Sequence, residues 1–287
     1  MASSQVWLIT GASSGFGTVL AKAALKAGHK VIATARNPVK AAEAHPEIES
    51  LGGRWLELDV TSPDTKEKVD KAIQEFGRID VVINNAGYSI LGSVEDMSEE
   101  EIHQQVNTNF YGPIRVIKAA LPYMRSQKSG TIVNVSSIAG LDGYPSCGLY
   151  AASKFALEGL SESLSRELAS FNIRVLLVEP GAFRTNFLGA FQSPAAGLTK
   201  DYEGTVLDDM LKTFHAANGK QPGDPVKAAD RIIEVISGTG MGAGKTHLLR
   251  LPLGPDCMNR ARAKVESLSK NLDEMEAIAL STDLEKP

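Results

Sequence analysis

The chain has 287 residues, of which 43% are hydrophobic and 22% are charged, and its formal net charge is -4 at pH 7. The composition is that of a globular protein, and an acidic balance without any Lys/Arg-rich block argues against nucleic-acid binding, which needs a clustered basic face. No apolar stretch is long enough to span a membrane, and residues 1–5 lack the regions of a secretion signal. Cys147 and Cys257 stand far apart without metal-ligand spacing, so we expect a cytoplasmic protein with free thiols and no metal site.

Short apolar runs alternate with longer helical patterns along the chain. This alternation predicts an α/β fold in which a parallel sheet is covered by helices on both faces. Asn37-Pro38 and Ser62-Pro63 each offer a capping side chain followed by proline, which is typical of the start of a helix. The seven runs, expected to form a seven-stranded doubly wound sheet, cover residues 6–10, 30–34, 55–60, 79–84, 131–136, 173–178 and 247–251.

Two segments depart from this alternation, but no linker divides the chain, so we expect residues 1–287 to form a single domain. Residues 182–224 hold glycines, prolines and aromatics around one helical stretch at 202–217, and are interpreted as a lid over a cleft. Residues 255–281 read as a helical tail. Its apolar stripe steps by three and four through Val265, Leu268, Leu272, Met275 and Ala279. Two heptads are too few to predict a coiled coil, so we interpret the stripe as packing on the body or on a partner subunit.

A glycine-rich turn follows the first run. There Thr10 precedes the pattern Gly11-x-x-x-Gly15-x-Gly17, and a helical stretch begins at residue 18. Glycines let the backbone approach a pyrophosphate closely, and the N–H groups at the start of the helix face its negative charge. A structural turn is the alternative.

A second candidate ligand motif, Asn84-Asn85-Ala86-Gly87, ends the fourth run. Open parallel sheets bind ligands at the carboxyl ends of their strands. Asparagine and glycine also form ordinary turns, so this motif alone does not decide the matter. Together with the first turn it favours a nucleotide site.

Residues 237–246 resemble the phosphate loop of nucleotide triphosphatases. That loop requires a glycine six residues before its lysine, and Thr239 occupies this position relative to Lys245. The loop should also leave a strand and open a helix, whereas residues 227–236 read as a helix and 247–251 as a strand. We therefore interpret the segment as a flexible glycine-rich connection and expect any nucleotide elsewhere.

Ser137 closes the fifth run, and Tyr150 and Lys154 open a helical pattern that continues to residue 169. Side chains four residues apart lie on one face of a helix. An ammonium group beside a phenol favours the phenolate and lowers a pKa that starts near ~10, which suits a general acid or base. A surface pair has the same spacing, so spacing alone does not decide.

Six motifs stand in one order along residues 5–254. They are Thr10-Gly11-x-x-x-Gly15-x-Gly17, Asn84-Asn85-Ala86-Gly87, Asn109-x-x-Gly112, Ser137, Tyr150-x-x-x-Lys154 and Pro180-Gly181-x-x-x-Thr185. In this order the chain resembles the short-chain dehydrogenase/reductase family, which implies a Rossmann fold and hydride transfer between a nicotinamide and a carbonyl or alcohol. Residues 150–159 and 250–254 resemble the branch that includes 17β-hydroxysteroid and retinol dehydrogenases. Phe16 departs from the isoleucine that is usual in the family.

By position, the resemblance implies a catalytic tetrad of Asn109, Ser137, Tyr150 and Lys154. Tyr150 would exchange a proton with the substrate oxygen, and Ser137 would hydrogen-bond to the same oxygen, where charge develops. Lys154 would lower the pKa of Tyr150 and hold the nicotinamide ribose, and Asn109 would anchor a water in the proton relay. Asn107 lacks a glycine three residues later and is interpreted as structural.

Ala35 and Arg36 indicate which nicotinamide cofactor is preferred. A carboxylate at the end of the second strand selects NAD, whereas Ala35 occupies that position here and is followed by a guanidinium suited to a phosphate. We therefore expect NADP(H) to be preferred over NAD(H). Asp59 resembles the family's contact to the adenine edge, although an ordinary strand-end turn would look the same. The expected cofactor-binding residues are Gly11, Ser13, Ser14, Gly15, Phe16, Gly17, Arg36, Asp59, Val60, Asn85, Ala86, Gly87, Tyr150, Lys154, Pro180, Gly181, Phe183 and Thr185.

The apolar side chains of residues 182–224 favour a hydrophobic ketone or secondary alcohol as substrate, unless they merely pack the lid onto the body. These side chains are Phe183, Phe187, Leu188, Phe191, Leu198, Tyr202 and Phe214. A catalytically silent NADP(H)-binding sensor or scaffold is the second hypothesis, which the presence of all four tetrad residue types disfavours. The family also implies a homo-oligomer, a dimer or tetramer assembled through two long helices.

Overall fold

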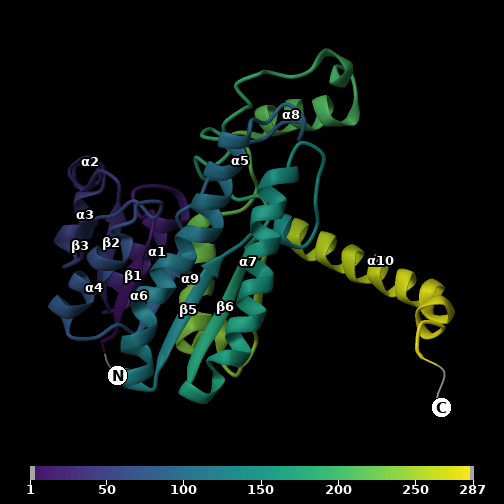
Figure 1. Cartoon of the computed structure of the whole chain (residues 1–287). Coiled ribbons are helices and arrows are strands. Elements are labelled where there is room, and N and C mark those ends of the chain that lie inside the picture. Colours follow the sequence, from purple (N-terminus) through teal and green to yellow (C-terminus); the bar gives the residue numbers. More distant parts are fainter. Residues whose placement is uncertain (1–3, 285–287) are drawn as a thin grey trace.

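A single parallel sheet of seven strands forms the centre of the protein (Figure 1). The computed structural model describes residues 4–284, and the strands in this part of the chain lie in the order β3-β2-β1-β4-β5-β6-β7. They are β1 (Val6–Ile9), β2 (Lys30–Ala35), β3 (Arg54–Glu57), β4 (Val81–Asn84), β5 (Gly130–Val135), β6 (Ile173–Pro180) and β7 (Arg250–Leu253). Every neighbouring pair is parallel, so the predicted doubly wound sheet is confirmed.

Helices cover both faces of this sheet. One core lies between the sheet and the helices α1 and α9, and the other between the sheet and the helices α4, α6 and α7. A π-helical stretch, Asn107–Tyr111, joins α5 to α6. The helices are α1 (Gly15–Lys26), α2 (Pro38–Ala44), α3 (Pro46–Ser50), α4 (Thr65–Phe76), α5 (Glu99–Val106), α6 (Gly112–Gln127), α7 (Gly148–Glu167), α8 (Val206–Ala217), α9 (Pro225–Ser237) and α10 (Pro255–Leu280). None of the helices within residues 4–284 has both the length and the apolar composition needed to cross a membrane.

Two strand boundaries differ from the prediction by three residues. β3 ends at Glu57, three residues before the predicted end, because the chain then turns through Asp59. β7 begins at Arg250 rather than at residue 247, since Leu248 is exposed and its N–H group donates to the carbonyl oxygen of Lys245 in a turn. An apolar run does not distinguish a strand from the turn that leads into it.

One of the two helix starts predicted from a capping residue followed by proline is correct. Asn37 caps α2 and accepts a hydrogen bond of 3.0 Å from the N–H group of Lys40. The prediction for Ser62-Pro63 is wrong, because α4 begins only at Thr65. The Thr65 hydroxyl donates to the Ser62 carbonyl oxygen at 2.7 Å, which keeps Ser62 and Pro63 in a turn before the helix.

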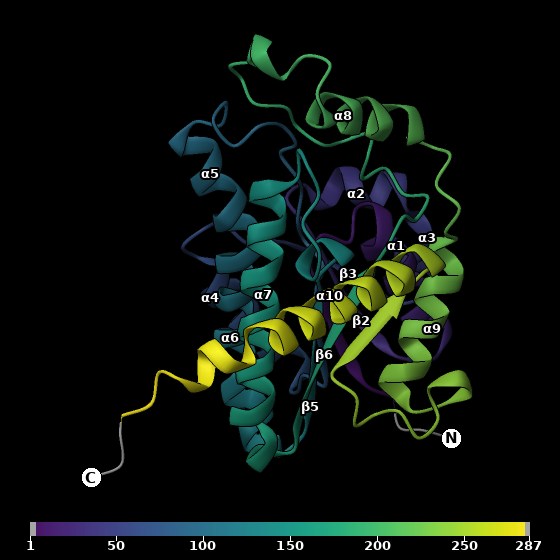
Figure 2. The same cartoon turned by 90° about the vertical axis from the view of Figure 1, so that its right-hand side faces the viewer.

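The segment 182–224, which contains α8, lies beyond the carboxyl ends of the strands (Figures 1 and 2). Backbone hydrogen bonds of 2.9 Å join Gln192 to the carbonyl oxygen of Ser89 and Leu91 to the carbonyl oxygen of Gln192. Farther along, the Thr199 N–H group donates to the Asp96 carboxylate at 3.1 Å. The segment is thus tied to the chain that follows β4.

The helix α10 leaves the body and extends away from it, as the two views show together (Figures 1 and 2). Its first turns are anchored, since Arg260 donates at 2.9 Å to the Asp142 carboxylate and lies 3.5 Å from the centre of the Tyr144 ring. From Val265 to the end of α10 every residue is exposed. The suggestion that this stripe packs on the body is therefore wrong for the distal part of α10.

The glycine-rich segment 237–246 has no phosphate-loop geometry. It follows a helix, α9, which Gly238 terminates in the left-handed conformation with φ 67°. The N–H group of Met241 donates to the Glu234 carboxylate at 3.1 Å, and β7 rather than a helix follows. The connection predicted here is confirmed, although it is fixed to α9 instead of lying free.

Candidate active site

The glycine turn after β1 lies beside the turn after β4. β1 sits between β2 and β4, where the strand order reverses, and open sheets bind ligands at such a point. The Thr10 hydroxyl accepts hydrogen bonds from the N–H groups of Asn85 (2.9 Å) and Ala86 (3.0 Å). The Asn85 amide donates in return to the carbonyl oxygens of Thr10 (3.0 Å) and Gly11 (3.2 Å). The two turns therefore form one unit.

Glycine is required at two positions of this unit. Gly11 has φ 64°, and a Cβ atom there would lie 2.9 Å from the Cα atom of Ala86. At Gly17 a Cβ atom would lie 2.3 Å from the Gly11 carbonyl oxygen and 2.6 Å from the Asn85 amide nitrogen. Both contacts are shorter than carbon atoms tolerate, so any side chain would force the turn and α1 apart.

The start of α1 presents backbone donors at the same edge of the sheet. Ser14 is the N-cap residue, but its side chain makes no capping hydrogen bond, and the first turn contains no acidic residue. Unpaired N–H groups and the helix dipole make such an end suitable for an anion. Ser13 and Ser14 are both exposed beside it.

Residues after β6 border this turn from the other side. The Phe183 ring packs edge-on against Phe16 with 5.3 Å between ring centres, and the Thr185 side chain lies 3.7 Å from where a Cβ of Gly15 would be. Gly181 follows Pro180, and its N–H group donates to the Leu253 carbonyl oxygen at 2.9 Å. Phe183 and Thr185 thus lie beside the glycine turn, whereas the backbone hydrogen bond of Gly181 is to β7.

Arg36 and Asp59 lie after β2 and β3 on the same carboxyl edge. Arg36 is exposed directly after the buried Ala35. The Asp59 carboxylate accepts hydrogen bonds from the Thr61 N–H group (2.9 Å) and hydroxyl (2.7 Å), so it also stabilises its own turn. Val60 is buried, and a Cβ at Gly112 would lie 2.8 Å from its side chain, which accounts for the glycine three residues after Asn109.

Ser137, Tyr150 and Lys154 meet where β5 ends and α7 begins. Ser137 is the N-cap of a short 3-10 turn and accepts a hydrogen bond of 3.1 Å from the Ala139 N–H group. Tyr150 and Lys154 are buried on one face of α7, and the Lys154 ammonium lies 5.8 Å from the centre of the Tyr150 ring. A Cβ atom at Gly87 would lie 3.7 Å from the Lys154 nitrogen, so these groups adjoin the turn after β4.

The spacing predicted that Lys154 lowers the pKa of Tyr150, but in the structure this pKa is raised. Burial raises the pKa of the phenol above its ordinary value, and the Ser137 side chain opposes this shift. Burial also lowers the pKa of Lys154 to about 8, while the Glu158 carboxylate acts in the opposite direction. Desolvation of the phenolate is the largest cause of this shift in the pKa of Tyr150, so the phenol is neutral at neutral pH.

Asn109 holds the backbone of the chain that follows β4. Its amide nitrogen donates to the Tyr88 carbonyl oxygen (2.9 Å) and to the Ser153 hydroxyl (3.1 Å), and its amide oxygen accepts from the Tyr88 N–H group (3.2 Å). The Ser153 hydroxyl donates in turn to the carbonyl oxygen of Tyr150 at 2.7 Å. Asn109 thus connects the turn after β4 to α7. Asn107 accepts a hydrogen bond of 2.8 Å from Arg115 and lies outside this network.

A partly buried ionic cluster that was not predicted from the sequence lies one turn beyond Lys154 on α7. Arg250 of β7 pairs with Glu158, with Glu179 (2.5 Å) and with Glu162 (2.5 Å). Burial raises the pKa of Glu158 to about 7 and also raises that of Glu179. The available signal was the spacing of four along α7, which places Lys154, Glu158 and Glu162 on the face that carries Tyr150.

An apolar cluster surrounds Tyr150. The centres of the Phe187 and Tyr150 rings are 5.6 Å apart. Tyr202, which was expected in this lining, instead donates its hydroxyl to Glu95 at 2.9 Å. The cluster consists of Leu91, Ala139, Cys147, Tyr150 and Ala151, with Phe191, Leu211 and Phe214 packed against it.

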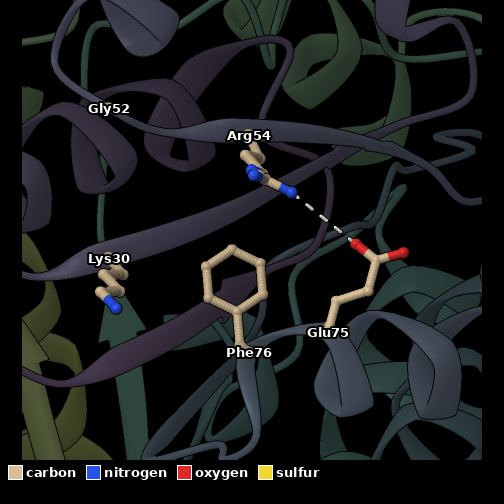
Figure 3. A pocket seen from close by; sticks show the side chains of 5 residues that line it. All are labelled: Lys30, Gly52, Arg54, Glu75 and Phe76. Atoms are coloured by element: carbon tan, nitrogen blue, oxygen red, sulfur yellow. Dashed lines mark ion pairs between the residues drawn. The ribbon is translucent and has the colours of Figure 1, made fainter.

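A hollow elsewhere on the surface is unrelated to this site (Figure 3). Lys30 and Arg54 are the first residues of β2 and β3, so the hollow lies at the amino edge of the sheet. Arg54 pairs there with Glu75 at 3.8 Å and lies over the Phe76 ring. The candidate active site occupies the opposite edge.

Residues 5–195 match the family model described as short chain dehydrogenase. The chain belongs to the short-chain dehydrogenase family. It is therefore an oxidoreductase, and the family model covers the glycine turn, Asn109, Ser137, Tyr150 and Lys154.

Curated relatives of this short-chain dehydrogenase are oxidoreductases as well. The oxidoreductase claN of Passalora fulva is 53% identical over 210 residues, which cover 73% of this chain and 95% of that protein. The 3-ketodihydrosphingosine reductase of Bacteroides thetaiotaomicron is 46% identical over 209 residues, covering 72% of this chain and 74% of that protein.

Solved structures share the fold along most of the chain. A short-chain dehydrogenase from Streptomyces avermitilis superimposes with a TM-score of 0.85 at 37% identity, covering 98% of this chain and 100% of the other. A metagenomic short-chain oxidoreductase in complex with NADP has a TM-score of 0.66 at 26% identity, over 87% and 96% of the two chains. A member from Burkholderia phymatum in complex with NAD shares the fold at 23% identity with a TM-score of 0.76, over 99% and 98%. Structural neighbours thus bind nicotinamide cofactors of both kinds.

Proposed function

We propose that this short-chain dehydrogenase interconverts a hydrophobic ketone and a secondary alcohol, using NADP(H), with Tyr150 as the proton donor and acceptor. The observation that carries the proposal is the burial of Tyr150 and Lys154 on one face of α7, next to Ser137 and beside the turn after β4. A proton donor, a second hydroxyl and an amine thus converge where the sheet binds ligands. A silent sensor or scaffold would not need this combination.

The residues present fit a dinucleotide. The side-chain-free turn at Gly11 and Gly17, followed by the uncapped start of α1, suits a pyrophosphate. Arg36, exposed after β2 where a carboxylate would select NAD, suits a 2'-phosphate. Lys154 and the turn at Asn85, Ala86 and Gly87 would border the nicotinamide ribose. When bound, the cofactor supplies or accepts the hydride.

The side chains of this protein would transfer the proton and stabilise the charge that develops on the substrate oxygen. Because burial raises the pKa of Tyr150, the phenol is protonated at neutral pH and can donate to a carbonyl oxygen. The Ser137 hydroxyl can donate a hydrogen bond to the same oxygen, which is strongest when that oxygen is most negative. The Lys154 ammonium would favour the phenolate left behind, so it acts after the proton has moved.

The substrate class follows from the apolar cluster over Tyr150. Phe187, Phe191 and Phe214 come from the segment 182–224, which we propose acts as a lid that encloses the apolar part of the substrate. A relative that is 46% identical is named a 3-ketodihydrosphingosine reductase, which agrees with a ketone as the reacting group. We further propose that the chain is a single-domain, cytoplasmic homo-oligomer.

The Tyr150→Phe variant tests the proton donor. Oxidation of NADPH should be followed against a panel of hydrophobic ketones, and kcat should fall about 100-fold or more, because general acid catalysis contributes factors of that size. NADPH binding, measured by calorimetry, should stay within about threefold of the parent value. Activity that survives the loss of the phenol would contradict the assignment. No activity of the parent protein on any ketone, with intact NADPH binding, would favour the sensor hypothesis.

The Arg36→Ala variant tests the cofactor preference. Loss of a charge-assisted phosphate contact should raise KM for NADPH about tenfold and leave KM for NADH unchanged. Lys40→Ala, which removes another exposed cation of the same region, should change neither value. If Arg36→Ala changed KM for NADPH and KM for NADH equally, or changed neither, the role of Arg36 would be refuted.

A further inference from the structure

The distal half of α10 carries an apolar stripe that nothing in the described chain covers. Val265 is 67% exposed, Leu272 is 74% exposed and Met275 is 56% exposed, and Leu268 lies between them. The spacing of three and four places these four side chains on one face of the helix. A helix with an exposed stripe of this kind requires a partner surface.

The charges of α10 are divided along its length. Arg260, Arg262 and Lys264 lie before the stripe, and Asp273, Glu274 and Glu276 lie in its last turns. Asp256 and Glu266 also lie in the first half and Lys270 in the second, so residues 255–267 carry a net charge of +1 and residues 268–280 a net charge of -2. Such a helix is complementary to itself when a second copy runs in the opposite direction, because each basic half then meets an acidic half.

We propose that α10 pairs with α10 of a second copy of this chain as an antiparallel two-helix interface. In the register that aligns the stripes, Leu268 faces Leu272 of the second copy and Val265 faces its Met275. The two-fold axis then passes near residue 270. This register buries the whole stripe in an isologous contact that closes after two chains.

The anchored first turns of α10 allow the antiparallel pairing. Arg260 anchors α10 to Asp142 and Tyr144, and the axis at residue 270 lies ten residues farther along, or roughly 15 Å at 1.5 Å per residue. The bodies of the two chains would therefore stay apart while the helices pair. An anionic membrane is a poorer partner, since the acidic distal half would be repelled by its surface.

One flank of the stripe supplies a specific test of direction. Arg262 and Glu276 are two heptads apart, so they lie on the same flank of the stripe. Within one chain they are separated by roughly 21 Å along the helix and cannot pair. In the antiparallel pair, Arg262 faces Glu276 of the second copy, and the contact occurs twice by symmetry.

The experiment is sedimentation velocity of the full chain over a series of concentrations. The parent protein should show a reversible association step that depends on α10, and Arg262→Glu and Glu276→Arg should each weaken that step at least tenfold. The double variant Arg262→Glu/Glu276→Arg should restore it to within about threefold of the parent. Glu266→Lys, a charge reversal on the face away from the stripe, should change the dissociation constant less than threefold.

Several outcomes would overturn the proposal. A parent chain that is monomeric at every concentration has no such interface. Dimerisation that withstands both single variants and Leu268→Glu uses another surface. If the double variant does not recover the dimerisation affinity of the parent, the antiparallel direction is excluded. In a parallel pair residue 262 would lie level with residue 262 of the second copy, so like charges would still face each other. These side chains are exposed and distant from Tyr150, so circular dichroism and NADPH oxidation should be unchanged, and the result is independent of the proposed reaction.

Discussion

The ammonium group of Lys154 donates a hydrogen bond of 2.9 Å to the carbonyl oxygen of Val135 at the end of β5. This contact fixes the amine between the sheet and the first turns of α7, beside Tyr150. On its other side lies Glu158, one turn farther along the helix and also buried. The amine is therefore held in place by the backbone, while the Glu158 carboxylate raises its pKa.

The pH dependence of the reaction should report the charge of Lys154. Its pKa is lowered to about 8, so the ammonium form is lost as the pH rises through that value, and kcat/KM should decline above about pH 8. Glu158→Gln removes a carboxylate that raises this pKa, so the decline should begin at lower pH. Steady-state rates between pH 6 and about 10 give the pH at which kcat/KM declines in the parent and in the variant. Glu162→Gln, on the same face but half exposed, is the matched control, and an equal shift in both variants would contradict the role of Glu158.

The stability of the fold should depend on the same carboxyl group. Burial raises the pKa of Glu158 from 4.5 to about 7, so the folded chain binds this proton more tightly than the unfolded chain between those values. The free energy of unfolding should therefore fall as the pH rises from about 4.5 to about 7. Urea denaturation at several pH values should show that Glu158→Gln flattens this dependence. A variant with the parent slope would refute the buried, protonated carboxyl.

The same substitution should have opposite effects at two glycines. Gly17→Ala places a methyl group 2.3 Å from the Gly11 carbonyl oxygen, so we expect a lower Tm and loss of NADPH affinity of tenfold or more. Gly159 lies in α7 with nothing within 4 Å of a Cβ, and Gly159→Ala should stabilise the protein by about 0.5–1 kcal/mol through helix propensity. Thermal denaturation and calorimetry with NADPH distinguish the two. A Tm of Gly17→Ala equal to that of the parent would show that the turn can relax.

Asn109 should contribute to both structure and catalysis. Asn109→Ala leaves the Tyr88 N–H group without its side-chain partner and removes one of the two donors to the Tyr88 carbonyl oxygen, the other being Gln105, which should lower the free energy of unfolding by about 1–3 kcal/mol and reduce kcat. Asn107→Ala removes only the contact with Arg115 and should leave kcat within about twofold. Urea denaturation and steady-state rates compare the two variants. If Asn107→Ala were the more damaging for kcat, the assignment of roles would be reversed.

The local signals of this chain were sufficient for the sheet and for most of its helices. Buried strands read as continuous apolar runs, and the proline after Asn37 marked a helix start, because these features depend on neighbours in the chain. The same signals were wrong at Ser62-Pro63 and at the start of β7, where hydrogen bonds of Thr65 and Leu248 hold the chain in turns. Such boundaries depend on contacts that a window of sequence does not contain.

The sequence by itself determined the alternation of strands and helices and the order of motifs along them, because periodicity and glycine spacing are properties of the chain. Only the tertiary structure decided that Arg250, ninety-six residues after Lys154, neutralises the carboxylates behind it. It also decided that burial, rather than the neighbouring amine, controls the pKa of Tyr150, and that the stripe of α10 faces away from the body. Desolvation and ion pairing depend on which distant residues exclude water from a side chain, and folding alone brings those residues together.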